Sequence, residues 1–358
     1  MKQWVLIGAA ILFLAVAACA SAQTQASITA SGSDLTAGGQ PFIAFGFNYA
    51  FGGTYPTLRY FDRPTRARLR VVRRDFAEAR RMGANTLRVF LEIGQFMADR
   101  RKPRTEALDA YERLLRIAER KGLYLDVSGN LSWRPGKRDR WYDRLDERDR
   151  WRTQARFWRA VARRSRRYDS VLCFELTSEP LVGQSNSWYT GRFGGLDFAQ
   201  FVARALGGRT PEAVARAWTR RMRTAIRSRD RRHLVTIGLL PYTRGPFAPA
   251  NVADLLDLLT VHQYPRQDKA DASVELMREF AAAGKPVILG ETFQLRGGPA
   301  TQEEFLLAAR PYLDGFLGFY DGRLPAQVDP VTFSDHLYRS SLEQMLALRP
   351  TLLAQAIQ

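Results

Sequence analysis

Apolar and polar positions alternate between two periodicities along most of the chain. Short, nearly continuous apolar runs have the length of buried strands. The segments between them carry apolar residues every three or four positions, as amphipathic helices do. Strands that alternate with helices predict a parallel sheet. The strand-like runs cover residues 43–48, 85–91, 123–127, 171–177, 233–240, 255–262, 286–290 and 316–320.

Eight such runs in 358 residues fit a closed α/β barrel, the (β/α)8 TIM barrel, better than a doubly wound sheet. No glycine-rich phosphate loop is present. Residues 27–42 predict a short N-terminal β-hairpin that closes the bottom of the barrel. Residues 181–208, rich in Gly, Ser and aromatic residues, predict a long loop.

Local signals place the ends of the predicted helices. Gly83 and Gly122 stand where two helices should stop, and Thr210-Pro211 is a typical helix start. A capping box, Thr301 to Glu304, predicts the start of another helix. The predicted helices cover residues 65–81, 105–121, 147–167, 210–226, 271–283, 301–312 and 334–348.

The N-terminus has the features of an export signal. Lys2 precedes a short apolar run, and Ala20-Ser21-Ala22 resembles a cleavage site. We therefore expect residues 1–22 to be removed and residues 23–358 to form one domain, periplasmic or secreted. Alternatively, residues 16–19 are a lipobox, and Cys19 carries a lipid anchor to a membrane. If cleavage follows Ala22, we expect no intrachain disulfide, because Cys173 is then the only cysteine of the mature chain.

The chain is strongly basic, with a formal net charge of +18 from 54 Lys and Arg against 36 Asp and Glu. Such a charge suits nucleic acid, an acidic polysaccharide or an anionic envelope surface. Arginines concentrate between residues 134 and 167, where Trp151, Ala155 and Trp158 recur at helical spacing. This pattern predicts an amphipathic helix with a solvated basic face. Since no nucleic-acid-binding module is recognisable, we expect no specific nucleic-acid partner. We expect a monomer.

Polar and aromatic residues follow the predicted strands, and the carboxyl ends of barrel strands converge on one face. Aromatic rings suit the flat faces of sugars, and amides and carboxylates suit their hydroxyls. A facing pair of carboxylates is what cleavage of a glycosidic bond requires. The residues at these ends are Asn48, Tyr49, Arg88, Asn130, Trp133, Glu179, Tyr242, His262, Tyr264, Glu291, Tyr320 and Asp321.

The order of these residues resembles the retaining glycoside hydrolases of clan A, in particular the cellulase and mannanase-like family 5. Thr177-Ser178-Glu179-Pro180, His262-Gln263-Tyr264 and Glu291 match that family's fourth, sixth and seventh strand ends. The resemblance implies a double displacement on a β-linked poly- or oligosaccharide, with Glu291 as nucleophile and Glu179 as acid/base. It also places Arg88 beneath the nucleophile.

Two positions depart from the family pattern. Ser178 replaces the usual Asn that holds the sugar 2-hydroxyl. The eighth strand lacks the usual Trp, so we expect Tyr320 to stack on the sugar instead. Trp188, in the long loop, is either a subsite residue or a satisfied surface aromatic. Glu175 should be buried beside an arginine.

Two alternative functions use the same residues. One is a non-catalytic glycan-binding barrel, which the serine at position 178 favours. The other is a transglycosylase that remodels envelope glycans. No cofactor is expected, and the three histidines lack the spacing of a metal site.

Overall fold

Eight parallel strands close into a barrel in the computed structural model, which describes residues 25–137, 140–193 and 196–354. Each strand pairs with the next along the chain, and the last pairs with the first, so the predicted TIM barrel is confirmed. The strands are β4 (Ala44–Asn48), β5 (Thr86–Glu92), β6 (Tyr124–Leu131), β7 (Val171–Ser178), β11 (Leu234–Leu239), β12 (Leu259–His262), β13 (Val287–Glu291) and β14 (Gly315–Phe319).

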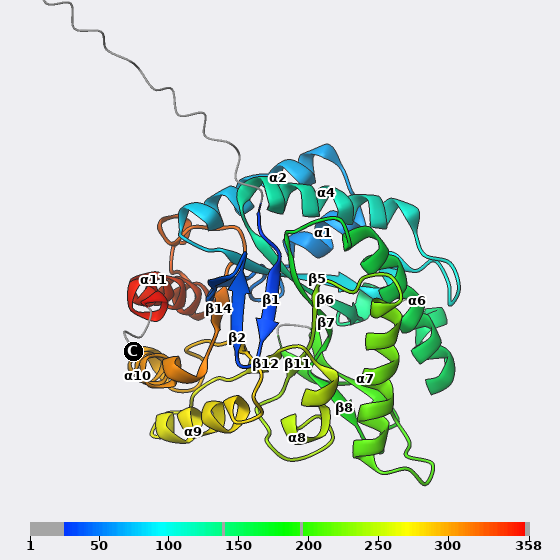
Figure 1. Cartoon of the computed structure of the whole chain (residues 1–358). Coiled ribbons are helices and arrows are strands. Elements are labelled where there is room, and N and C mark those ends of the chain that lie inside the picture. Colours follow the sequence, from blue (N-terminus) through cyan, green and yellow to red (C-terminus); the bar gives the residue numbers. More distant parts are fainter. Residues whose placement is uncertain (1–24, 138–139, 194–195, 355–358) are drawn as a thin grey trace, which may run out of the picture.

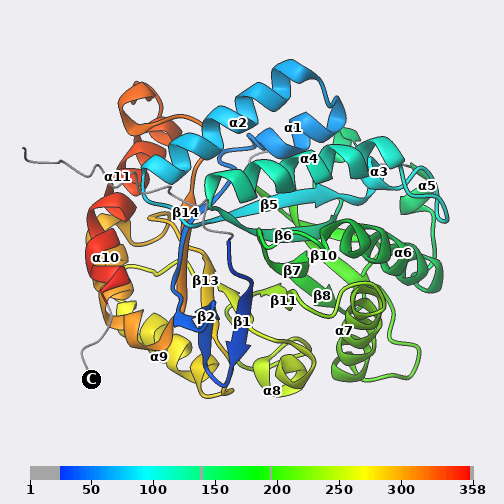
Figure 2. The same cartoon turned by 45° about the horizontal axis from the view of Figure 1, so that its top comes forward.

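Helices surround the strands on the outside (Figures 1 and 2). Four long helices between barrel strands, α2, α4, α6 and α7, bury their apolar faces against the wall. The helices are α1 (Pro56–Asp62), α2 (Arg66–Arg81), α3 (Ile93–Phe96), α4 (Thr105–Lys121), α5 (Arg140–Asp143), α6 (Glu147–Ser165), α7 (Pro211–Arg227), α8 (Pro249–Val252), α9 (Ala270–Ala281), α10 (Gly298–Ala309) and α11 (Phe333–Leu353).

Capping residues explain several of the helix ends. The Thr65 and Thr210 hydroxyls accept hydrogen bonds from backbone N–H groups in the first turns of α2 and α7. Gly122 ends α4 in the left-handed conformation. The predicted capping box at Thr301 is wrong, because α10 begins one turn earlier, at Gly298. Pro299 suits that first turn, where its missing N–H needs no partner.

The connection between β11 and β12 is the least helical of the seven that join successive barrel strands. It contains only the four-residue α8 and a 3-10 turn at Ala253–Leu255. The predicted strand at residues 255–262 therefore begins four residues late, at Leu259. Its apolar run starts inside the turn, where Leu256 and Leu258 are buried without belonging to the sheet.

A small antiparallel sheet covers the amino end of the barrel. It consists of β1 (Ile28–Ser31), β2 (Asp34–Ala37) and β3 (Gln40–Pro41). Ile28 and Leu35 pack with Leu172, Leu234 and other residues at the strand starts. The expected hairpin is confirmed, with one extra short strand.

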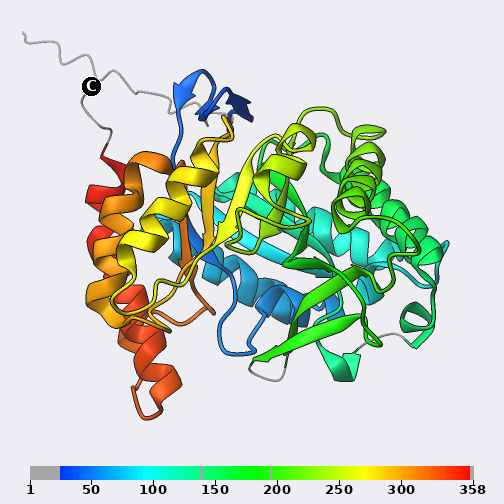
Figure 3. The same ribbon diagram turned by 90° about the horizontal axis from the view of Figure 1, so that it is seen from below.

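The segment predicted as a long loop forms a second small sheet. Its strands are β8 (Pro180–Val182), β9 (Tyr189–Phe193) and β10 (Leu196–Ala203), in the order β8-β10-β9. Figure 3 shows this sheet at the end of the barrel opposite β1 and β2. We call this end, where the barrel strands finish, the mouth. Local composition did not predict this sheet. Its central strand, β10, pairs with β9 and also with β8, which comes before β9 in the chain.

The predicted signal, residues 1–22 with Cys19, lies outside the described residues. Among the residues that the structure does describe, no helix combines the length and apolar character that crossing a bilayer requires.

Candidate active site

Two glutamates face each other at the mouth. Glu291 is the last residue of β13, and Glu179 directly follows β7. One carboxylate oxygen of each lies within 4.8 Å of the other. Glu179 is buried, and the Glu291 side chain is 13% exposed. Residues 112 positions apart in the chain thus meet across a space that can hold the bond between two sugars.

The backbone at Glu179 turns sharply out of the strand. Its φ is 48°, in the left-handed region that non-glycine residues rarely adopt. The Glu179 N–H donates to the Gly238 carbonyl at 2.8 Å, which holds the turn against β11. Asn130, just inside the end of β6, has a similar φ of 57°. A non-glycine residue in this region costs about 1–2 kcal/mol, and such outliers concentrate at functional sites.

Arg88 lies beneath the pair and is fully buried. One terminal nitrogen donates to Glu291 and to the Asn48 side-chain oxygen, the latter at 2.8 Å. The other terminal nitrogen donates to Glu175 at 2.6 Å, as expected for a buried partner of an arginine. Burial alone would lower the pKa of Arg88, but Glu175 and Glu291 raise it well above its ordinary value.

Asn48 ties this cation to three strands. Its amide nitrogen donates to the carbonyls of Gly290 and Gly318, at 2.8 and 2.9 Å. The side-chain oxygen is then left to accept from Arg88. The guanidinium is therefore held in one orientation by β4, β13 and β14 together.

His262 and Tyr264 complete the contacts to the two carboxylates. His262 Nδ1 lies 2.9 Å from Glu179 Oε1 and 3.6 Å from Glu291 Oε1. The Tyr264 hydroxyl donates to the other oxygen of Glu291 at 2.5 Å. Glu291 therefore receives a guanidinium and a hydroxyl, whereas Glu179 is contacted chiefly by the histidine.

These unequal surroundings separate the two carboxyl groups electrostatically. Burial, together with the nearby Glu291 carboxylate, raises the pKa of Glu179 despite the opposing effect of His262. Burial also acts to raise the pKa of Glu291, but His262, Arg88 and Tyr264 outweigh it and lower that pKa. One carboxyl group of the pair thus favours the protonated form and the other the anion, which is the division that an acid and a nucleophile need.

Two glycines make room for this arrangement. A Cβ at Gly238 would lie 2.8 Å from a Glu175 oxygen and 3.0 Å from His262 Nε2. A Cβ at Gly290 would lie 2.2 Å from the Thr260 methyl. Neither glycine is among the residues predicted to form the site. Their signal is a glycine inside an apolar strand, which marks a close approach but does not tell what approaches.

An aromatic wall borders the pair. The Trp133 ring lies 5.6 Å from that of Tyr55 and 5.3 Å from that of Phe90. Burial and the charge of Glu291 raise the pKa of Tyr55, which places this tyrosine near the nucleophile candidate. Tyr55 and Phe90 were missed from the sequence, because neither stands directly at the end of a predicted strand.

The remaining predicted polar residues lie close to the same end. Asn130 donates to the Leu176 carbonyl at 3.2 Å, across to β7. Ser178 is buried in the last position of β7, opposite Gly238 of β11. Both belong to the strand ends that carry the site.

Glu179, His262 and Glu291 each offer one atom that could bind a metal ion. However, the guanidinium of Arg88 already contacts Glu291 and supplies positive charge there. A second cation would be repelled at that oxygen. The three side chains are therefore better suited to proton transfer than to holding a metal.

Comparison with known proteins agrees with this geometry. A sequence model of the cellulase family, glycosyl hydrolase family 5, matches residues 37–304. This chain belongs to that family. The protein is accordingly a glycosidase. A search among curated proteins finds no match.

Solved structures share the fold of this family 5 glycosidase at low identity. An exo-beta-1,4-mannosidase from Opitutaceae bacterium strain TAV5 is 18% identical with a TM-score of 0.66, and the alignment covers 91% of this chain and 63% of that one. The GH5_18 protein from Streptomyces cattleya in complex with GlcNAc is 19% identical with a TM-score of 0.63, covering 88% and 81%. An endo-1,4-beta-mannanase from Rhizomucor miehei is 15% identical with a TM-score of 0.61, covering 90% and 99%. The chain thus spans less than two thirds of the Opitutaceae enzyme.

Two predicted site residues lie on the other side of the barrel wall of the glycosidase. Tyr49 donates to Asp75 of α2, and Tyr320 donates to Glu78 of α2 at 3.1 Å. Both tyrosines are fully buried. The prediction that Tyr320 stacks on the sugar is wrong, as is the placement of Tyr49 at the site. Neighbouring residues of a strand point to opposite faces, and Asn48 already takes the inner face.

Trp188 is a buried aromatic residue that packs against two arginines. The guanidinium groups of Arg150 and Arg204 lie over its ring, at 4.2 and 4.3 Å. The residue is only 5% exposed. Of the two alternatives for Trp188, a satisfied aromatic fits this structure better than a subsite residue.

Arg88→Ala tests the electrostatic base of the site. Removing one partner of a buried ion pair should destabilise the fold by about 3–5 kcal/mol, measured by urea denaturation. Without the guanidinium, the pKa of Glu291 in the folded variant should rise, because only His262 and Tyr264 then oppose the effect of burial. A lowered carboxyl pKa stabilises the fold above the unfolded pKa, and the variant loses part of that stabilisation. The deficit should therefore be larger at about pH 7 than at about pH 4.

The matched control is Arg66→Ala, which removes an exposed arginine from α2. It should change stability by less than about 0.5 kcal/mol at either pH. Equal, pH-independent effects of the two substitutions would contradict a central role for Arg88.

Proposed function

We propose that the protein is a retaining β-glycosidase in which Glu291 is the nucleophile and Glu179 the acid/base. The observation that carries this proposal is the close approach of two carboxyl groups with oppositely shifted pKa values. Retaining enzymes hold these groups about 5–5.5 Å apart, whereas inverting enzymes need about 6.5–9.5 Å to admit a water. Oxygen atoms within 4.8 Å support the retaining class.

In the first step, the Glu291 carboxylate forms a bond to the anomeric carbon while the glycosidic C–O bond breaks. Glu179 gives its proton to the departing oxygen, so the leaving group departs as an alcohol. The raised pKa of Glu179 lets it keep this proton to a higher pH than an ordinary glutamic acid does. The product of the step is a glycosyl ester of Glu291.

In the second step, water attacks the same carbon, Glu179 accepts a proton from that water, and Glu291 leaves as a carboxylate. Esterification removes the negative charge of Glu291, one of the causes that raise the pKa of Glu179. Glu179 therefore becomes a better base once the ester has formed. Arg88 and Tyr264 stabilise Glu291 again as it leaves.

β-1,4-linked mannosides are the substrates that we propose first. The support is the activity printed for two structural neighbours, an exo-beta-1,4-mannosidase and an endo-1,4-beta-mannanase. Tyr55 of the aromatic wall is partly exposed, with the buried Trp133 ring 5.6 Å away, and it offers the kind of surface on which a pyranose ring packs.

Glu291→Ala should abolish turnover, with a loss of at least about 10,000-fold in kcat. Glu179→Ala should lose about 100- to 10,000-fold on a mannan, and much less on an aryl mannoside whose leaving group needs no proton. The measurement is the release of reducing ends from mannan and of phenolate from the aryl mannoside.

The control for both variants is Glu303→Ala, which removes an exposed glutamate of α10 and should leave turnover unchanged. Full activity of Glu291→Ala on a substrate that the wild type cleaves would refute the assignment. If the wild type binds mannan but releases no product from any β-glycan, the glycan-binding alternative is favoured.

The pH dependence of kcat/KM should be bell-shaped. Activity should fall at low pH as Glu291 is protonated, and at high pH as Glu179 loses its proton. His262 lowers the pKa of both carboxyl groups, so in His262→Ala both limbs should move to higher pH. The control is His336→Ala, at an exposed position, which should leave the profile unchanged. If neither limb of the pH profile moves in His262→Ala, groups other than this pair set the profile.

We also propose that the protein is exported, on the support of the signal-like sequence at residues 1–22. Mass spectrometry of the mature protein from a bacterial host should find a chain that begins at Gln23. A diacylglyceryl group on Cys19 would instead identify a lipoprotein. A chain that still carries residues 1–18 in the membrane-free fraction would contradict export.

A further inference from the structure

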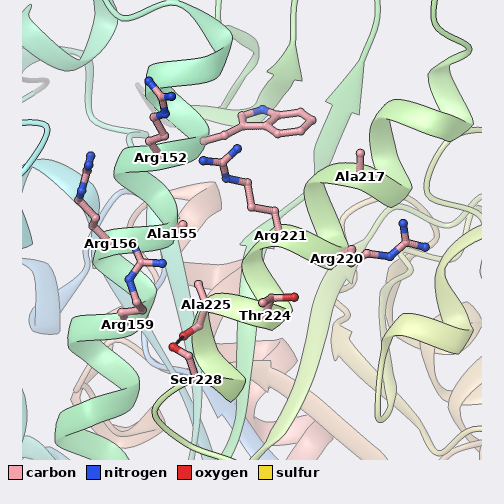
Figure 4. A pocket seen from close by; sticks show the side chains of 11 residues that line it. Arg152, Ala155, Arg156, Arg159, Ala217, Arg220, Arg221, Thr224, Ala225 and Ser228 are labelled. Carbon is pink, nitrogen blue, oxygen red and sulfur yellow. Dashed lines mark hydrogen bonds between the residues drawn. The ribbon is translucent and has the colours of Figure 1, made fainter.

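A groove of about 750 Å³ runs between α6 and α7 on the outer surface of the barrel. Figure 4 shows Arg152, Arg156 and Arg159 succeeding one another along α6, while Arg221 extends from α7 towards that helix. None of the described residues that line the groove is acidic. The lining residues are Trp151, Arg152, Ala155, Arg156, Arg159, Ala217, Arg220, Arg221, Thr224, Ala225 and Ser228.

The shape of the groove follows from small side chains between the arginines. Ala155 on α6 and Ala217 and Ala225 on α7 leave space where larger residues would fill the contact. The arginines of α6 repeat at intervals of four and three residues, so they share one face. They cover about 10 Å of helix axis, which is longer than a single carboxylate or phosphate group.

These arginines have few counter-charges in the protein. For Arg159, Arg220 and Arg221, the described part of the chain supplies no ion pair within 4 Å. Arg156 donates to the carbonyl of residue 100 at 2.9 Å. Arg152 is the exception, since it lies 3.2 Å from Asp149.

Some other arginines of the same two helices are paired. Arg164 of α6 contacts Asp109 and Glu112, at 2.8 and 2.7 Å. Arg216 of α7 contacts Asp254 through both terminal nitrogens, each at 2.7 Å. The groove differs from these places because its arginines face one another and no acidic side chain lines it.

The unpaired arginines repel one another. Partial burial and the charges of Arg156, Arg229 and Arg221 lower the pKa of Arg159. Partial burial and the charges of Arg152, Arg156 and Arg148 lower the pKa of Arg221. An anion in the groove would relieve this repulsion and accept the free N–H donors of several guanidinium groups.

We propose that this groove binds a chain of an acidic polysaccharide, in which successive carboxylates meet the successive arginines. Single-stranded nucleic acid is a poorer fit, because its binding grooves present aromatic rings for base stacking. The one aromatic side chain of the groove, Trp151, is 8% exposed and donates to the Val202 carbonyl at 2.7 Å. A flat bilayer surface does not follow a groove between two helices. The choice of a polysaccharide among polyanions rests on the proposed function.

The groove lies apart from the two glutamates but leads towards the mouth. In a barrel each helix runs back from the strand ends, so the N-terminal turns of α6 and α7 lie at the mouth end. Trp151, at that end of the groove, contacts β10 through Val202. A chain held along the helices therefore emerges beside the sheet that borders the mouth.

The test compares two triple variants that each lower the net charge of +18 by three. The groove variant is Arg156→Gln, Arg159→Gln and Arg221→Gln. The matched control is Arg66→Gln, Arg70→Gln and Arg73→Gln, on exposed positions of α2. All are made in a Glu291→Ala background, so that binding is measured without cleavage.

Binding to polygalacturonate is measured by isothermal titration calorimetry, with uncharged mannan, single-stranded DNA and vesicles containing anionic phospholipid as further probes. The groove variant should bind polygalacturonate about tenfold more weakly or worse, and the control less than about twofold more weakly. Added salt should weaken the binding of the parent protein. Mannan binding and the folded content by circular dichroism should not change.

Equal weakening in both triple variants would overturn the proposal, because net charge alone would then explain binding. Tighter binding to DNA or vesicles than to polygalacturonate, lost in the groove variant, would assign the groove to another polyanion. If β-mannan cleavage fails in the wild type while groove-dependent binding persists, the proposed reaction fails and the groove site stands.

Discussion

The buried guanidinium of Arg88 is the interaction on which the active end of this barrel depends. Its ion pairs with Glu175 and Glu291 lie inside a closed sheet, where an unpaired charge would cost several kcal/mol. One cation does not balance every carboxyl group there. Burial and the Glu175 carboxylate raise the pKa of Asp126 to about 7, so this third group retains its proton more readily. The Arg88 guanidinium is thus shared by Glu175 and Glu291, whereas Asp126 and Glu179, which do not contact it, have raised pKa values.

The sheet accepts local strain to hold these groups in place. Glu179 adopts a left-handed backbone, and it is stabilised by one backbone hydrogen bond to Gly238. The same glycine leaves the space into which Glu175 and His262 project. An alanine there would favour a regular strand but would displace the histidine that contacts both glutamates. The backbone thus departs from regular strand geometry where the side chains of the site converge, as is usual at functional sites.

The barrel and the centre of the site could be predicted because both follow from simple rules. Strands buried on both faces are continuous apolar runs, and parallel strand ends meet, so Arg88, Glu179, His262 and Glu291 could be brought together from sequence. The face of each residue could not be predicted so well. The pairing of β12 with β13 shifts register between Val261 and His262, and that of β7 with β11 also shifts. After such a shift, counting every second residue along the strand no longer tells which side chains point into the barrel.

Contacts between distant segments account for the other errors. Whether Tyr320 faces inward or outward is decided by the space beside Glu78 on α2. Trp188 is unavailable to a substrate because Arg150 and Arg204, which come from distant parts of the chain, pack against its ring. The arginines of α6 were predicted to form a solvated basic face. That expectation treated one helix alone, whereas the groove exists only because α7 places Arg221 opposite them.

The active site and the groove between α6 and α7 carry opposite charges, which restricts the kind of polymer that could bind to both. The mouth holds an anionic Glu291, which would repel a uronate placed in the cleavage position. The groove between α6 and α7 would attract the same uronate. One polymer can therefore serve both places only if neutral β-linked sugars alternate with acidic segments along it, or carry acidic branches. Attachment and cleavage would then act on different parts of one chain, and the basic surface would hold the polymer without competing for the active site.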